Sequence, residues 1–68
     1  MKRYYCKNVM HFTNTGAAVK VDAGTDAEKA LIKNGWERIT RREAENISHH
    51  NANKIDTAYI NIYGLIVY

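Results

Sequence analysis

The residues of this sequence that could carry chemistry are three histidines, one cysteine and seven carboxylates. His49 and His50 are adjacent, and neighbours on a helix point about 100° apart, so they cannot hold one metal ion as residues four apart can. No local signature marks Cys6 as a nucleophile. The four glycines are scattered singly and form no phosphate-binding loop. The sequence therefore predicts no enzyme, no cofactor and no metal site.

The basic residues form a more informative pattern. Arg41 and Arg42 fall in the first turn of a predicted helix, where the helix dipole disfavours cations. Arginines beside free helix amides would bind an anion, either a phosphate backbone or the acidic side chains of a protein. The alternative is that they form surface salt bridges with Glu37 or Glu45. The predicted anion site, which assumes that the lysine lies near the arginines in space, consists of Lys33, Arg38, Arg41 and Arg42.

The last ten residues, Tyr59 to Tyr68, are the most apolar stretch of the chain and are rich in β-branched and aromatic side chains. This composition predicts a single strand. Because side chains of a strand alternate, one face carries Ile60, Ile62 and Ile66. The opposite face is the predicted interface and carries Tyr59, Tyr63, Leu65 and Val67, with the isoleucine face and the strand edge as alternatives. Neither face suits water, so the strand is either central in its sheet or half covered by another molecule.

Two short helices are expected between the strands. Thr25 to Glu28 and Thr40 to Glu43 both have the form of a capping box, in which the threonine and the glutamate each bind the other's backbone amide. Gly35 stands where a left-handed residue would end the first helix. The predicted helices are 26–34 and 41–50.

The remaining segments are predicted to form a small sheet. The expected strands are Arg3 to Phe12, Ala17 to Val21, a short strand over Trp36 to Ile39, and the terminal stretch, with a turn at Thr13 to Gly16. The order is β-β-α-(β)-α-β. This predicts an α+β fold with a mostly antiparallel sheet of three to four strands and two short helices on one face.

A chain of 68 residues forms one domain, 1–68, and buries only about 60% of the surface that its unfolded form exposes. Cys6 has no partner for a disulfide, which favours a reducing cytoplasm, and oligomerisation is the simplest remaining source of stability. Two short helices cannot cover both faces of the sheet. We therefore expect the uncovered face to be buried by a second copy, giving a homodimer, or by another protein.

The net charge of +3 does not by itself indicate nucleic acid, since nucleic-acid-binding modules usually carry a denser basic stripe. Five tyrosines could serve as a base-stacking surface, but the aromatic consensus of the RNA-recognition fold is missing, which favours a protein interface. A small basic nucleic-acid-binding module is the alternative prediction. No segment has the length and hydropathy of a signal peptide or a membrane span, which predicts a cytoplasmic protein without membrane contact.

Several phrases of the chain resemble small accessory proteins of phages and prophages. They are Tyr5 to Asn8, Thr15 to Val21, and Gly35-Trp36-Glu37-Arg38-Ile39-Thr40. The phrase from Ile39 to Ile47, followed by a final strand, also resembles short anti-defence proteins such as some anti-CRISPRs. This resemblance implies a non-enzymatic protein that binds and blocks a larger host protein or nucleoprotein complex in the host cytoplasm. Many anti-defence proteins have acidic surfaces, and this basic chain departs from that pattern.

Overall fold

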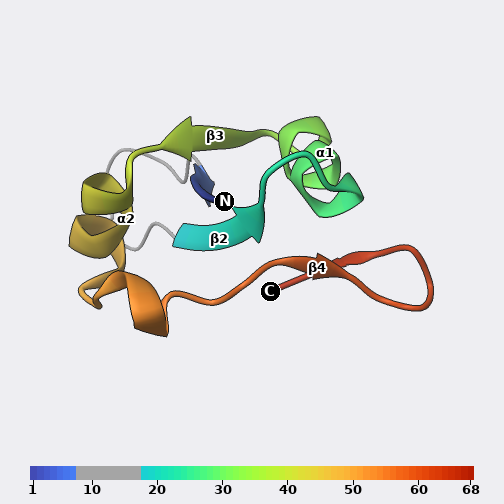
Figure 1. Ribbon diagram of the computed structural model, residues 1–68. Helices are drawn as coiled ribbons and strands as arrows, with labels where there is room; N and C mark the ends of the chain where they lie inside the picture. The colour runs from blue at the N-terminus through green and yellow to red at the C-terminus, as the bar shows by residue number, and fades with distance from the viewer. Residues whose placement is uncertain (8–17) are drawn as a thin grey trace.

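The computed structural model describes residues 1–7 and 18–68, which form a three-stranded sheet, two α-helices and a C-terminal hairpin (Figure 1). The predicted α+β class and the antiparallel sheet are confirmed. The elements, in chain order, are β1 (Lys2–Lys7), β2 (Ala18–Asp22), α1 (Asp26–Lys33), β3 (Trp36–Ile39), α2 (Arg41–Ser48), the 3-10 helix η1 (Ala52–Lys54), β4 (Tyr59–Ile60) and β5 (Ile66–Val67).

Strand β1 lies in the middle of the sheet and is antiparallel to both β2 and β3. A further segment runs along the outer edge of β2, in the parallel direction. Lys20 N–H donates to the carbonyl of Asp56 at 2.9 Å, and Ala58 N–H donates to the carbonyl of Lys20 at 2.8 Å. These bonds satisfy backbone groups on the β2 edge and fix the direction in which the chain enters the hairpin.

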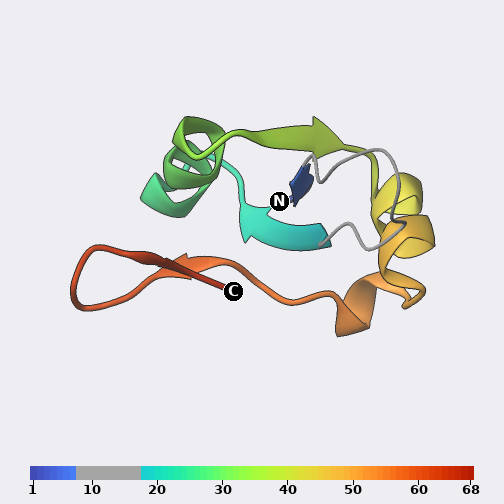
Figure 2. The ribbon, with the colours of Figure 1, turned by 180° about the vertical axis from the view of Figure 1, so that it is seen from behind.

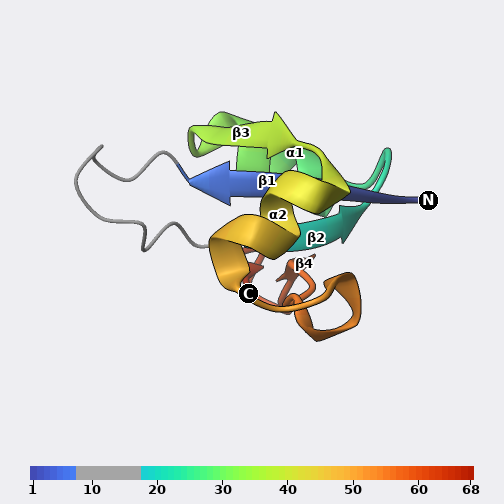
Figure 3. The same ribbon diagram turned by 90° about the vertical axis from the view of Figure 1, so that its left-hand side faces the viewer.

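The two helices lie on opposite faces of the sheet, with α2 in front of the strands and α1 behind them in Figure 3. The prediction that both helices share one face is therefore wrong. Tyr5 and Cys6 are neighbours on β1 and point to opposite faces. Tyr5 O–H donates to Glu28 of α1, whereas Cys6 is within electrostatic reach of Glu43 of α2. The physical reason is that Tyr4, Tyr5 and Cys6 follow one another along β1, so both faces of the strand carry apolar side chains and need cover.

The main core lies on the α1 face. Leu31 of α1 is fully buried against the sheet, and Ile60 and Ile66 of the hairpin pack on the same cluster. The buried members of the cluster are Tyr5, Val19, Val21, Ala27, Leu31, Trp36 and Ala58.

A smaller set of buried residues, Ala44, Ala52 and Ile55, stands outside this cluster. On the α2 face, Lys20 Nζ donates to the carbonyl of Ala52 at 2.9 Å.

The ends of both helices follow local sequence signals. Thr25 and Thr40 are the N-caps, and Gly35, with φ of 85°, follows α1 in the left-handed conformation. His49, with φ of 58°, ends α2 in the same conformation, so the helix stops before the predicted residue 50. The Thr40 capping box is complete, but Glu28 does not return to Thr25, because its carboxylate binds other donors. No helix among the described residues is long and apolar enough to cross a membrane.

The prediction of one terminal strand over 59–68 is wrong, because this stretch folds back as the β4–β5 hairpin (Figures 1 and 2). The reason is turn chemistry within the apolar run, where Asn61 and Gly64 are three residues apart. The short strand at Trp36–Ile39 is confirmed. β1 is paired with β2 as predicted, while residues 8–12 of the predicted first strand and the turn at 13–16 lie outside the described residues.

Candidate functional site

The turn of the C-terminal hairpin, residues 61–65, is fixed by hydrogen bonds to Asn61. Its Oδ1 accepts from the backbone N–H of Tyr63 at 2.9 Å and of Leu65 at 3.0 Å. Its own N–H donates to the carbonyl of Leu65 at 2.9 Å, and Gly64 N–H donates to the carbonyl of Asn61 at 3.0 Å. Gly64 has φ of 76°, a left-handed conformation that glycine adopts without steric cost. The turn therefore has a defined shape before any partner binds.

This turn exposes three large apolar side chains. Ile62 is 91% exposed, Tyr63 79% and Leu65 63%. We call Ile62, Tyr63 and Leu65 the apolar tip. Single exposed apolar residues are common on protein surfaces, whereas several on one ordered turn mark an interaction site.

The base of the hairpin is anchored in the main core, which holds the apolar tip in place. Ile60 and Ile66 are paired across the hairpin and pack against the buried cluster. The ring of Tyr68 stacks edge-on against buried Trp36, with ring centroids 5.0 Å apart and an interplanar angle of 71°. The turn extends beyond α1 at the end of the hairpin (Figures 1 and 2).

The four predicted interface residues all belong to this hairpin, but they do not share the face of one strand. Tyr63 and Leu65 lie in the apolar tip, while Tyr59 and Val67 are paired across the strands at its base. Tyr59 is exposed and Val67 is partly buried. Ile62 was assigned to the opposite face, yet it is the most exposed of the group. The Asn61-x-x-Gly64 spacing is the sequence signal that could have located the turn and so identified Ile62.

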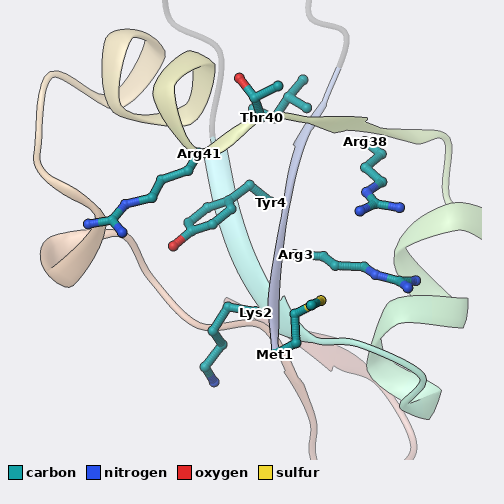
Figure 4. A pocket seen from close by; sticks show the side chains of 8 residues that line it. Met1, Lys2, Arg3, Tyr4, Arg38, Thr40 and Arg41 are labelled. Atoms are coloured by element: carbon teal, nitrogen blue, oxygen red, sulfur yellow. The ribbon is translucent and has the colours of Figure 1, made fainter.

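A second surface lies where the chain passes from β3 into α2, beside the start of β1. It is an open hollow of about 910 Å³. We call it the basic hollow, and its lining residues are Met1, Lys2, Arg3, Tyr4, Arg38, Ile39, Thr40 and Arg41. Arg3 and Arg38 point to one side of β1, while Tyr4 and Arg41 point to the other (Figure 4).

Acidic partners neutralise two of the four cations in the basic hollow. Lys2 Nζ lies 2.9 Å from Asp22, and the Arg3 guanidinium lies 3.1 Å from Glu28. No ion pair joins an acid to Arg38, Arg41 or the adjacent Arg42 within residues 1–7 and 18–68, which contain all seven acids.

The two glutamates that could have paired with these arginines do not. Glu45 is turned towards η1, where its Oε2 accepts from Ala52 N–H at 2.9 Å. Glu37 forms no salt bridge in the part of the chain that the structure describes. The alternative of surface salt bridges is therefore not seen, and the three arginines face solvent as charged groups.

Lys33, the fourth residue of the predicted anion site, does not line the basic hollow. It lies at the end of α1 beside a different hollow, which it shares with Gly64, Leu65 and Ile66 of the hairpin. The expectation that Lys33 adjoins the arginines is not supported by these linings, since Lys33 shares neither hollow with Arg38 or Arg41.

Glu28 is the buried anion of the molecule and is only 5% exposed. It accepts from Gly24 N–H at 2.9 Å, from Tyr5 O–H at 2.8 Å and from Arg3. The Gly24 amide, the Tyr5 hydroxyl and the Arg3 guanidinium together lower the pKa of Glu28. Burial, and then the hydrogen bond to Glu28 and its negative charge, raise the pKa of Tyr5. This network is structural, since every one of its members lies between the sheet and the start of α1.

The cysteine and the metal-binding residue types offer no site in the described part of the chain. Burial, and then Glu37 and Glu43, raise the pKa of the Cys6 thiol, which leaves it a poor nucleophile. His49 and His50 are exposed at the end of α2. Within residues 1–7 and 18–68, no three His, Cys, Asp or Glu side chains converge as metal ligands.

Comparison with protein-family models, with curated proteins and with solved structures found no match to this chain.

Proposed function

We propose that this protein is a non-enzymatic binding protein that uses the apolar tip to contact a larger protein. The observation that carries this proposal is the exposure of Ile62, Tyr63 and Leu65 on a hydrogen-bonded turn. Burying three such side chains is worth about 5–8 kcal/mol before the costs of association. Because the turn is already ordered, little further entropy is lost when it binds.

The shape of the hairpin favours a concave partner over a second copy. A stable interface buries about 800 Å² on each side, and the whole chain exposes 5051 Å². Two narrow turns meeting end to end bury far less than this, whereas a groove on a larger protein can enclose the hairpin from several sides. The predicted homodimer stays a prediction, and sedimentation velocity tests it against a 7.8 kDa monomer.

The resemblance to phage accessory proteins supplies the remaining part of the proposal. It suggests that the partner is a host protein or nucleoprotein complex in the host cytoplasm, and that binding blocks it. The exposed tip supports binding, and a partner that encloses it in an apolar cleft would be inhibited by losing access to that cleft.

A photo-crosslinker placed at Tyr63, with a matched one at Lys29 on α1, tests the contact in a host lysate. The captured protein is then purified and titrated with the chain. We expect Ile62→Ala with Tyr63→Ala to weaken this binding at least 30-fold, in line with the loss of an aromatic anchor. A Lys29→Ala variant serves as the control and should bind as the native chain does. Unchanged affinity in the tip variant would show that the contact lies elsewhere.

A further inference from the structure

We propose that the basic hollow binds the phosphodiester backbone of a nucleic acid, as a second site separate from the apolar tip. Three of the four arginines of the chain line this hollow, Arg3, Arg38 and Arg41, and the fourth, Arg42, follows Arg41 in the first turn of α2. Of the six lysines, only Lys2 lines it. Arginine presents a planar fork of donors that fits two phosphate oxygens at once, which lysine cannot do.

Two of the cations that line the hollow are ion-paired and two are not, and the unpaired cations are the ones that can bind an anion. Arg3 and Lys2 are already committed to Glu28 and Asp22. Arg38 and Arg41 are exposed, line the hollow and form no ion pair with any of the seven acids. Their full charge is therefore available to an incoming anion.

The arrangement of these side chains favours a polymer over a single small anion. Arg38 points to one side of β1 and Arg41 to the other, so they do not converge on one point (Figure 4). A small anion would touch only one of them. A chain of phosphates crossing the open hollow can meet both in succession. Arg42, the residue after Arg41 on α2, adds a third exposed positive charge.

An acidic protein segment carries negative charge as a nucleic acid does, but it fits this surface less well. Carboxylates on a peptide are irregularly spaced, whereas phosphates repeat at a fixed interval along a strand. Tyr4 also lines the hollow on the Arg41 side, and a phenol ring is a stacking surface for a base.

The test is a fluorescence-anisotropy titration of a labelled 15-residue oligothymidylate against the native chain and two double variants. Arg38→Ala with Arg41→Ala removes two charges from the hollow. Lys29→Ala with Lys54→Ala removes two charges from exposed positions outside it and so has the same net charge. We expect the arginine variant to bind at least tenfold more weakly than the lysine variant at low salt. Circular dichroism checks that both remain folded.

The salt dependence gives a second measurement. Each phosphate contact with a single strand contributes roughly −0.7 to the slope of log K against log salt, so three arginines predict a slope of about −2. The arginine variant should show about −0.7 and the lysine variant about −2. Equal losses in the two variants would mean that net charge alone drives binding, and would overturn the site.

Two competitors decide the class of ligand. Poly-glutamate at the same charge concentration should displace the oligonucleotide poorly, and inorganic phosphate should require a large excess. Efficient displacement by poly-glutamate would assign the hollow to acidic proteins instead, and efficient displacement by phosphate would make it a single-anion site. The Ile62→Ala, Tyr63→Ala variant should bind the oligonucleotide normally, which separates this proposal from the one on the apolar tip.

Discussion

The two helices begin with the same four-residue pattern, and the structure uses it in two ways. At α2, Thr40 Oγ1 accepts from Glu43 N–H at 3.1 Å, and Glu43 Oε1 accepts from Thr40 N–H at 3.1 Å. At α1, Thr25 Oγ1 accepts from Glu28 N–H at 3.4 Å, but the Glu28 carboxylate turns inward to Gly24, Tyr5 and Arg3. The start of α2 is therefore a local motif, whereas the start of α1 is part of the core.

The difference comes from what each helix faces. β1 brings Arg3 and Tyr5 to the α1 side, where a partly buried guanidinium and a buried hydroxyl are satisfied by one anionic acceptor. The buried residue of α2 is Ala44, which has no polar side chain that Glu43 could bind. Glu28 of α1 therefore stabilises the fold by accepting hydrogen bonds from these groups. The start of α2 stays at the surface, where Arg41 and Arg42 are exposed.

The largest expected effect is the contrast between Glu28→Ala and Glu43→Ala. Removing Glu43 breaks one capping contact, worth about 0.3–1.5 kcal/mol. Removing Glu28 leaves Arg3, Tyr5 and the Gly24 amide without their acceptor, so its loss of unfolding free energy should be several times larger. Urea unfolding followed by the fluorescence of Trp36, which is buried and is the single tryptophan, measures both. Equal losses would reduce Glu28 to a capping residue.

A smaller loss is expected from Tyr5→Phe, which removes one donor from Glu28 and keeps the buried ring. A hydrogen bond to a charged group is worth about 1.5–3 kcal/mol. In the Glu28→Ala background the hydroxyl has lost its partner, so the same change should then cost much less. A double-mutant cycle measures this coupling, and additive losses would show that the Tyr5–Glu28 bond carries no stability.

The pH dependence of stability should also report on the buried position of Glu28. The folded-state pKa of Glu28 is lowered, so between the ordinary carboxyl range and this lower value the unfolded chain binds more protons. The stabilisation is thus present above the ordinary range and is lost as pH falls through the lowered pKa. Urea midpoints at pH 7, 5, 4 and 3 should fall steeply in the native chain and less steeply in Glu28→Gln. A native slope in Glu28→Gln would contradict the assignment.

The same contrast shows what the sequence could and could not predict. Local signals predicted both helix starts, the strand at Trp36–Ile39 and the α+β class, because caps and alternation act within a few residues. The hydrogen-bond partners of Glu28 and the placement of the helices on opposite faces depend on contacts between segments that are distant in sequence. A local sequence pattern does not predict such contacts. Among the site residues, the arginines were predicted, while Ile62 was missed because the Asn61–Gly64 turn was read as part of a strand.

The smallest expected effect concerns the first turns of the helices. α1 carries Asp26 there, which the helix dipole favours, whereas α2 carries Arg41 and Arg42, which it disfavours. Arg41→Asp should therefore stabilise the fold by about 0.3–1 kcal/mol, and Asp26→Arg should destabilise it by a similar amount. Thermal unfolding at low salt measures both changes.

Arg41→Asp should at the same time weaken binding of the oligothymidylate, since Arg41 lines the basic hollow. A stabilising change that removes binding is the signature of a residue kept for function at a cost in stability. If Arg41→Asp instead destabilised the fold, Arg41 would be holding α2 in place. The difference between the two helix starts would then lie in packing, with no surface at α2 left free for a ligand.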